Sequence, residues 1–579
     1  MMKNKKFPQQ LQVIDEEEEF VDEEQRIVEM KSQWRLRKQK INKRTFNVNF
    51  RCGVCVCVVL LVILVPTILI KNWPTAKFHP PPPDEYTIAL KKALQFFDAQ
   101  KSGRLPKNNP ISWRNDSGLG DLEGGYYDSG GNMKISFPMA FSMSILSWSV
   151  IEYRHKYKSV GEYDHIRDII KWGTDYLLRT FNSSTGTIDL IYSQVGVDDR
   201  RCWQRPEDVE YSHTGQKVYR GPDLGSEMAA ALASASIVFA DDKIYSKKLI
   251  KGATALFEFA MDDNKRPSTP SSSKTNKDIA KLYRSSDYHD EYIWAAAWMY
   301  YATGNSVYLS IATDPGIPKQ AKALHLTAEL SALSWDNKFP AAELLLTRLR
   351  VFLRPGYPYE GMLKCYHNLN DRNMCSYLEK FNVYNFTKGG LILMNRAGFK
   401  NLQYAANAAF IAALYFDYMK AMGVPGWYCG PQYIDADDLY KFATSQVHYI
   451  LGANPRNLSY VVGYGEKYPK HVHHRGASIP KDGHIYNCTE GLRWRDTHNS
   501  NPNNVTGAMV SGPDRFDGFI DVRTNYSYTE PTLAGNAGLV AALVSLTTSG
   551  GSVIDKNTMF SGVPPDYPVS PSPPPPWKP

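Results

Sequence analysis

The residues best suited to chemistry lie in one C-terminal segment, from Phe519 to Thr532. It holds two carboxylates, Asp521 and Glu530, with Arg523 and the aromatic ring of Tyr526, just before an apolar stretch. A carboxylic acid can protonate the oxygen of a leaving group, and aromatic rings pack well on large apolar faces such as that of a sugar ring. The same residue types also build loops of caps and ion pairs, and composition alone favours that structural role.

Two further segments are rich in polar side chains and glycine. Residues 459–475 end with His473 and Arg475, and residues 124–132 read Gly-Gly-Tyr-Tyr-Asp-Ser-Gly-Gly-Asn, with Asp128 at the centre. A histidine close to an arginine in a loop is more often structural than catalytic. Residue type alone therefore makes these side chains candidates and no more.

The spacing of these residues carries more information than their types. From Phe519 onward the order is aromatic, any residue, Asp, four residues, aromatic, three residues, Glu, any residue, Thr, three residues, Asn, Ala. This order resembles the C-terminal signature of glycoside hydrolase family 9, and residues 459–475 resemble a second signature of that family. Further likeness, specifically to its plant membrane-anchored endo-β-1,4-glucanases, lies in residues 202–208, 229–236, 300–305, 425–429 and 574–579.

The resemblance implies an all-α fold, an (α/α)6 barrel, that hydrolyses internal β-1,4-glucosidic bonds with inversion. An inverting reaction needs a general acid and, about 6.5–9.5 Å away across the sugar ring, a base that deprotonates a water. The residues that the resemblance implies are Glu530 as the acid, Asp521 as a supporting carboxylate, Asp128 and His473 as further catalytic residues, and Arg475, Tyr526 and Trp427 as substrate-binding residues.

One position departs from the family pattern. Family members carry Asp-Ala-Gly-Asp after Gly-Gly-Tyr-Tyr, with the second Asp as the base, whereas this chain has Asp128 followed by Gly131 at the position of the base. The amide of Asn132 cannot accept the proton instead. Because a positioned base contributes about 10²–10⁴-fold to the rate, we expect ordinary hydrolysis to be impaired. Three explanations are open: Asp128 has become the base, Asp121 or Glu123 substitutes for it, or the chain binds glucan without cutting it well.

Helices must position these groups, because strand-like alternation is sparse along the chain. Apolar residues recur at spacings of three and four, which is typical of helices. The predicted helical stretches are residues 86–101, 138–157, 163–180, 225–240, 244–262, 290–303, 319–332, 340–353, 402–420, 435–451 and 533–548. Paired helices closed into a barrel, with functional loops at one end, suit this pattern.

A transmembrane segment is predicted before this domain, at residues 52–70. These nineteen residues carry no charge and would span roughly 28 Å as a helix, close to the ~30 Å of a hydrocarbon core. Eight basic residues precede the segment between Lys31 and Arg51, and two follow it closely, so we expect a type II orientation with the N-terminus in the cytosol. The predicted organisation is a cytosolic tail (1–51), a signal anchor (52–70), a proline-rich stalk (71–85), a catalytic domain (86–562) and a proline-rich tail (563–579).

The charge of the chain argues against a nucleic-acid partner. The net charge is +8, but residues 72–579 hold 54 basic and 50 acidic residues and are nearly neutral. The sequence shows no nucleotide-binding loop and no Cys/His zinc spacing, so we expect no cofactor and no metal.

Translocation would place five cysteines in an oxidising compartment, leaving at least one unpaired, with a connectivity that the sequence does not give. It would also make the Asn-x-Ser/Thr sites glycan acceptors: Asn115, Asn182, Asn385, Asn457, Asn487 and Asn504. Asn525 lies within the C-terminal signature and is expected to be buried and unmodified.

Two functions from different classes follow. The first is an endo-β-1,4-glucanase linked to plant cell-wall metabolism, with its catalytic domain extracellular or lumenal, at the plasma membrane or in secretory endomembranes. The alternative is a non-catalytic, membrane-tethered glucan-binding protein that assists the cellulose synthesis machinery. The residue that separates them is Gly131.

Overall fold

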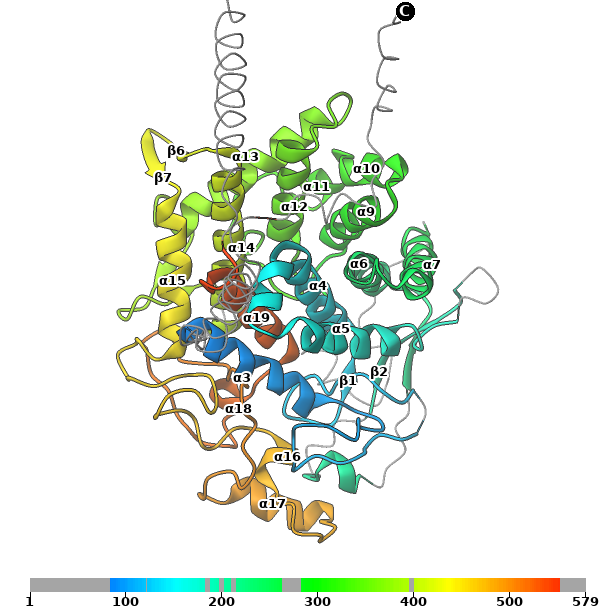
Figure 1. Cartoon of the computed structure of the whole chain (residues 1–579), viewed down its shortest axis with the longest axis vertical. Helices are drawn as coiled ribbons and strands as arrows, with labels where there is room; N and C mark the ends of the chain where they lie inside the picture. The colour runs from blue at the N-terminus through cyan, green and yellow to red at the C-terminus, as the bar shows by residue number, and fades with distance from the viewer. Residues whose placement is uncertain are drawn as a thin grey trace, which may run out of the picture. The chain divides into compact units, whose positions relative to one another are not determined.

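Helices dominate the part of the chain that the structure describes (Figure 1). The computed structural model describes residues 84–120, 122–182, 188–196, 202–209, 215–262, 283–394, 400–551 and 554. The chain divides into two units, residues 1–81 and 82–579, and all described residues belong to the second. None of the helices in these ranges is long and apolar enough to cross a membrane; the predicted anchor, cytosolic tail and C-terminal tail lie outside them.

Six of the described helices pack side by side in a closed ring. They are α4 (Ser136–Ser159), α6 (Pro222–Val238), α9 (His289–Thr303), α12 (Phe339–Phe352), α14 (Asn401–Met422) and α19 (Leu533–Leu546), and α19 contacts α4 to close the ring. Every residue of α6 and of α19 is buried. A helix that is apolar on all sides belongs in a core, and the many Ala, Ser and Gly residues of these two helices let their neighbours approach closely.

A second helix backs each member of the ring. These outer helices are α5 (Tyr163–Leu177) on α4, α7 (Lys243–Ala260) on α6, α10 (Ser306–Ala312) on α9, α13 (Glu360–Tyr377) on α12, α15 (Asp437–Leu451) on α14 and α3 (Glu85–Gln100) on α19. An outer helix such as α5 buries only one face, through Ile166, Ile169, Ile170 and Gly173. Six helices inside six is the arrangement of an (α/α)6 barrel.

Most predicted helices agree with the structure, and one does not. The stretch predicted at 319–332 is a short helix, α11 (Gly316–Gln320), followed by turns, and Lys322 has a φ of 55° that a helix cannot contain. Two barrel helices were not predicted from the sequence: α10 is only 7 residues long, and α13 contains Asn, Asp and Cys residues of low helix propensity. Packing against α12 stabilises α13 despite that propensity.

Short strands decorate the barrel. One antiparallel sheet joins β1 (Lys134–Ile135), β2 (Ile191–Val195) and β3 (Gly215–Val218), with Lys134 opposite Val195. The pairs β4 (Asn385–Phe386) with β5 (Ile392–Leu393) and β6 (Gly426–Cys429) with β7 (Gln432–Asp435) form two hairpins. In Figure 1 the β6–β7 hairpin lies at the top, whereas three short helices, α16 (Arg475–Ser478), α17 (Cys488–Asp496) and α18 (Tyr526–Thr529), lie at the bottom.

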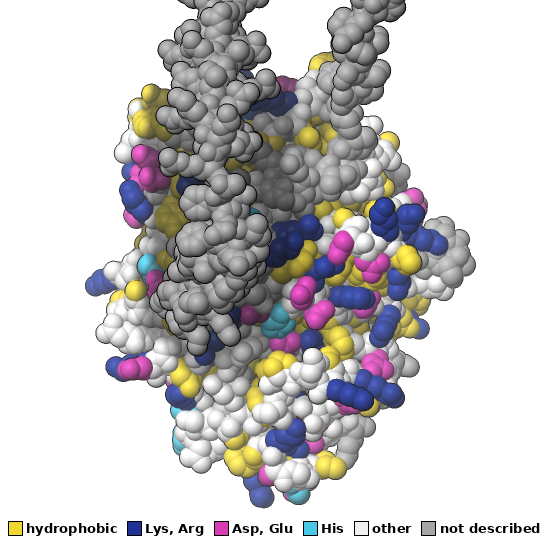
Figure 2. Space-filling model, viewed as in Figure 1, with side chains coloured by type: hydrophobic (Ala, Val, Ile, Leu, Met, Phe, Trp, Pro, Cys, Tyr) yellow, Lys and Arg dark blue, Asp and Glu magenta, His cyan; other side chains and the backbone are white. Residues whose placement is uncertain are grey.

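Two disulfides tie long-range segments together. One joins Cys202 to Cys488 and the other joins Cys375 to Cys429, leaving Cys365 as a free thiol. The six predicted glycan acceptors, Asn115, Asn182, Asn385, Asn457, Asn487 and Asn504, are all exposed. Asn525 is half-buried, so the expectation of full burial was wrong. On the face seen in Figure 2, acidic and basic side chains are interspersed among the described residues.

Candidate active site

Asp128 is fixed by hydrogen bonds of its backbone and of its side chain. Its backbone nitrogen donates to Met133 O at 2.9 Å, and its carbonyl accepts from Leu533 N at 2.8 Å, which fixes the loop to the first residue of α19. Its side chain is buried, and Oδ2 accepts a hydrogen bond from the Tyr283 hydroxyl at 2.5 Å. Oδ1 is also buried and has no hydrogen-bond partner among the described residues.

The environment of Asp128 makes its carboxyl an unusually strong proton acceptor. Burial raises the pKa of Asp128 to about 6, the negative charge of Glu530 adds to the rise, and the hydrogen bond from Tyr283 opposes it. A pKa near 6 suits a general base that works close to neutral pH. Because the charge of Glu530 acts on Asp128, these two carboxylates, far apart in sequence, belong to one site.

Glu530 follows the last residue of α18. Its backbone nitrogen donates to Tyr526 O at 3.2 Å, and its carbonyl accepts from the Ser511 hydroxyl at 2.7 Å. The carboxylate oxygen Oε2 lies 3.5 Å from the ammonium of Lys400, at the start of α14. The predicted acid therefore has a fixed backbone and a cationic neighbour.

His473 is hydrogen-bonded to the residue that precedes Glu530. Its backbone nitrogen donates to Thr529 O at 3.2 Å, and its Nδ1 lies 2.7 Å from Arg523 O. Because a carbonyl only accepts, Nδ1 must carry a proton. The ring packs edge-on against Trp203, with centroids 4.9 Å apart, and lies 5.9 Å from the ring of Tyr526.

Arg475 connects the segment of His473 to the loop that carries Asp128. Its backbone nitrogen donates to Gly130 O at 2.8 Å, and its guanidinium lies over the Trp203 ring at 5.4 Å. A Cβ at Gly130 would meet the carbonyl oxygen of His473 at 1.8 Å, so no side chain fits there. The close approach of these two backbones is what brings Asp128 beside His473.

Gly131 is different from its neighbour. A Cβ at this position would meet nothing within 4 Å, and the backbone does not lie in the left-handed region that favours glycine. An aspartate would therefore fit on the present backbone. Next to it, the Asn132 amide donates to Gln204 O at 3.0 Å and is held away from any role as a base.

Asp521 supports the site from a distance. Its carboxylate accepts from the backbone nitrogens of Lys470 and His471 at 2.8 and 3.0 Å, and it also contacts the His471 ring at 3.1 Å. These bonds fix the start of the loop that ends in His473. In the described contacts Asp521 acts through this loop.

The two predicted aromatic binding residues are placed very differently. Tyr526 is 47% exposed beside His473, where a sugar could reach it. Trp427 is buried in β6, with Nε1 3.2 Å from Cys375 Sγ and its ring against Tyr415. It follows the far end of α14, a helix about 33 Å long at 1.5 Å per residue that begins beside Glu530. The substrate-binding prediction for Trp427 is therefore at odds with its position in the core.

Of the other carboxylates proposed as a base, Glu123 is described, and its contact lies elsewhere. Glu123 accepts from the backbone nitrogen of Arg104 at 2.9 Å, in the loop between α3 and β1. Asp121 lies outside the described residues. Of the three candidates, Asp128 is the one that the described structure places with Glu530.

Three residues of this site were not predicted from the sequence. Tyr283 and Lys400 contact the two carboxylates, and Gln100 donates to the carbonyls of Tyr127 and Ser129, at 3.0 and 2.8 Å, on both sides of Asp128. None of them belongs to a recognisable motif. Only their approach in space identifies them.

Two cavities of the described structure differ in the side chains that line them. One of about 300 Å³ is lined by polar groups that include Asp287, Asp336 and Tyr404. The ring of Trp335, the residue before Asp336, lies 6.0 Å from the ring of Tyr283. Burial raises the pKa of Asp336 to about 6.

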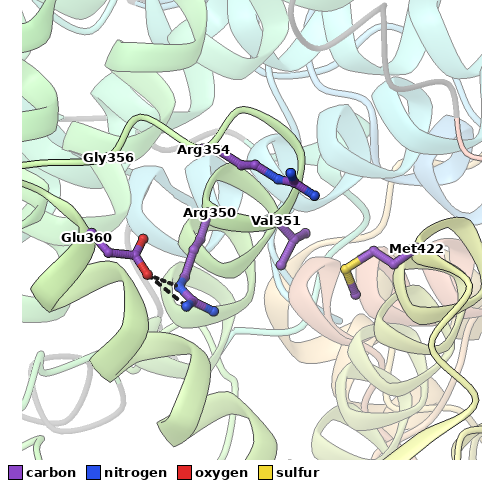
Figure 3. A pocket seen from close by; sticks show the side chains of 6 residues that line it. All are labelled: Arg350, Val351, Arg354, Gly356, Glu360 and Met422. Carbon is purple, nitrogen blue, oxygen red and sulfur yellow. Dashed lines mark hydrogen bonds and ion pairs between the residues drawn. The ribbon is translucent and has the colours of Figure 1, made fainter. Parts of the chain in front are cut away.

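The second cavity lies at the opposite end of α14. Figure 3 shows this pocket of about 350 Å³, lined by Arg350, Val351, Arg354, Gly356, Glu360 and Met422. Arg350 already forms two hydrogen bonds to Glu360, and no carboxylate pair like that of the site lines this pocket. Within the described residues, no cluster of His, Cys, Asp or Glu is arranged to hold a metal ion.

Comparison with known proteins agrees with this geometry. Residues 86–543 match glycosyl hydrolase family 9. Endoglucanase 12 of Oryza sativa subsp. japonica is 58% identical over 541 residues, which cover 90% of this chain and 86% of that protein.

Solved structures give the same result. An endoglucanase from the termite Nasutitermes takasagoensis superposes with a TM-score of 0.68 at 32% identity, covering 80% of this chain and 98% of the termite chain. The cellulase Cel9M of C. cellulolyticum in complex with cellobiose gives a TM-score of 0.64 at 28% identity, with coverages of 80% and 98%. The barrel and the paired carboxylates agree with these matches, and the chain belongs to glycosyl hydrolase family 9.

Proposed function

We propose that this chain hydrolyses internal β-1,4-glucosidic bonds of cellulose or a related β-glucan, with inversion and at a reduced rate. The observation that carries the proposal is the meeting of Asp128 and Glu530 beside His473 and the exposed ring of Tyr526. One carboxylate can serve as acid and the other as base. The names of its relatives, endoglucanases and a cellulase bound to cellobiose, support a glucan as the substrate.

The reaction would divide between the two carboxylates. Glu530 delivers a proton to the glycosidic oxygen as the C–O bond breaks, and a water attacks the anomeric carbon from the other face. Asp128 takes the proton of this water, with its free Oδ1 as the acceptor and Oδ2 held by Tyr283. Because Gly131 supplies no second carboxylate, the water is less well positioned, and we expect a loss within the 10²–10⁴-fold range of a general base.

A non-catalytic glucan-binding role is the second candidate. Two observations favour it: Gly131 at the position of the family's base, and the pairing of Glu530 with Lys400. In this case the loops that carry His473 and Tyr526 would hold a glucan chain while the cellulose synthesis machinery acts on it.

The cellular setting is part of the proposal. The uncharged segment 52–70 with its basic N-terminal flank supports a single-pass type II anchor at the plasma membrane or in secretory endomembranes. The domain would then face the cell wall or a secretory lumen. Its exposed Asn-x-Ser/Thr sites are compatible with glycosylation there.

The deciding experiment uses the full-length chain with a soluble β-1,4-glucan and with cellotetraose. We expect binding of cellotetraose and slow release of sugars with inverted anomeric configuration, read by NMR. Binding without any turnover would favour the second candidate, and absence of both would contradict the proposed function.

A further inference from the structure

The strongest unexplained feature of the site is the cation beside its acid. Lys400 Nζ lies 3.5 Å from Glu530 Oε2, and the two side chains are 37% and 14% exposed. The pair is thus partly shielded, at the start of an inner helix of the barrel. A lysine that served only the stability of the fold could pair with any surface carboxylate. Lys400 pairs instead with the predicted proton donor.

The backbone of Lys400 is unusual as well. Its φ of 57° and ψ of 34° lie in the left-handed region, where glycine and asparagine are favoured and a lysine is uncommon. Such outliers cluster at functional sites, where the surroundings hold them in place. The lysine therefore occupies a position that its own conformational preference does not explain.

The chemistry of the pair opposes proton delivery. An ammonium can only donate hydrogen bonds. If Oε2 carried a proton that faced Lys400, the O–H and N–H groups would both be donors and could not bond to each other. An opposite charge at this range favours the charged form of a carboxyl group. A glycosidic oxygen approaching Oε2 would also have to displace the ammonium.

The other ionisable groups around Glu530 come from three elements. Asp128 lies before β1, Tyr283 lies before α9, and His473 donates its backbone nitrogen to Thr529 O. Asp128 and Tyr283 each interact electrostatically with Glu530, and the charge of Lys400 also acts on Asp128. Lys400 thus offsets the negative charge of both carboxylates.

We propose that Lys400 is a positioning residue that keeps Glu530 paired as a carboxylate and must move aside before Glu530 can protonate a leaving oxygen. The lysine thereby limits hydrolysis independently of the missing base at Gly131. The inference rests on the proposed function only in taking Glu530 as the acid.

The test compares Lys400→Met with Lys400→Arg, which keeps the charge, and with Lys441→Met, which removes an exposed lysine paired to Asp438 near the start of α15. Two substrates are used near neutral pH: a β-1,4-glucan, whose leaving group needs protonation, and an aryl β-cellobioside with a strongly acidic phenol, whose leaving group does not. We expect Lys400→Met to raise turnover of the glucan roughly five- to tenfold relative to the aryl glycoside. Lys400→Arg and Lys441→Met should keep the wild-type ratio.

A second readout does not need turnover. In the infrared spectrum of the full-length chain near neutral pH, the Glu530 carboxyl band, assigned by Glu530→Gln, should shift in Lys400→Met relative to the wild type and Lys400→Arg, because the neighbouring ammonium is gone. An unchanged Glu530 band, or an unchanged substrate ratio in a turning-over enzyme, would overturn the role of Lys400. If cellotetraose does not bind at all, the proposed function fails, and the infrared shift still decides the inference.

Discussion

The hydroxyl of Tyr283 donates to Asp128 Oδ2 at 2.5 Å, while Oδ1 of the same carboxylate is buried without a partner among the described residues. Burial and the nearby charge of Asp128 raise the pKa of Tyr283 well above its usual value, so the tyrosine stays a donor. Tyr283 thus fixes Oδ2, and the lone pairs of Oδ1 are not used by any described residue. This relationship makes Asp128 the best candidate for the base that Gly131 no longer provides.

Restoring the family's second carboxylate should increase activity. We expect Gly131→Asp to raise hydrolysis of a soluble β-1,4-glucan at least about tenfold, because a positioned base contributes 10²–10⁴-fold. The structure leaves space for the side chain, whereas Gly130→Asp would collide with His473 O and serves as the matched negative control. Reducing-sugar release measures the effect. A wild type that already turns over like an ordinary family member would refute the argument from Gly131.

The role of Glu530 as the acid can be tested separately from substrate binding. Glu530→Gln keeps the shape of the side chain but cannot deliver a proton as a carboxylic acid does, so glucan hydrolysis should fall by about 10²-fold or more. Binding of cellotetraose, measured by calorimetry, should remain nearly intact. Unchanged turnover on a substrate with a poor leaving group would remove Glu530 from the mechanism.

The pKa of Asp128 predicts the acid limb of the pH profile. A base must be ionised to accept a proton, so the kcat/KM of the wild type should fall as the pH drops below about 6. In Gly131→Asp this dependence should weaken, because a second carboxylate shares the task. If Asp128 is the surrogate base, Asp128→Asn should harm the wild type more than the Gly131→Asp enzyme. The opposite order would exclude that role.

The same pKa predicts a cost in stability. Between the unfolded value of about 3.9 and the folded value of about 6, the folded state binds more protons, so the free energy of unfolding falls as pH rises. Above this window the loss is complete and is on the order of 3 kcal/mol. Asp128→Asn should therefore unfold at a higher temperature than the wild type at pH 8, and the difference should vanish near pH 4. Equal melting temperatures at pH 8 would contradict the burial argument.

Trp427 and Tyr526 should show opposite effects. Trp427→Ala removes a buried ring and should cost about 3–5 kcal/mol of stability, with little change in the cellotetraose affinity of the folded protein. Tyr526→Ala removes a half-exposed ring beside His473 and should weaken binding with a small effect on stability. Thermal unfolding and calorimetry on both variants distinguish the two roles. A loss of affinity on Trp427→Ala without destabilisation would restore the original prediction.

How much the sequence could reveal depended on the range of each interaction. The helices of the ring carry strong apolar patterns, as in α6 and α19, and were predictable from local sequence. The helix α13 was not, since its stability comes from packing on α12. The stretch 319–332 failed for the opposite reason: its residues favour a helix, but Lys322 adopts a left-handed turn.

The site divides in the same way. Glu530, His473 and Asp128 lie in segments with fixed spacing, so a resemblance could identify them. Tyr283 and Lys400 are single residues on distant loops, and only folding brings them to the carboxylates. Trp427 shows the converse error, because its neighbours resemble the family while its side chain supports the core near Cys375.

The contact of α3 with α19 joins the first described helix to the last one, and Asp84 accepts hydrogen bonds from Thr548, 464 positions later. During synthesis the ring therefore stays open until the final helix has left the ribosome, and the largely apolar flanks of α4 and α14 wait uncovered. Contacts of such sequence separation close slowly and expose the unfinished chain to aggregation. Because Glu530 lies just before this last helix, a chain that terminates before Glu530 lacks both the acid of the site and the helix that closes the barrel.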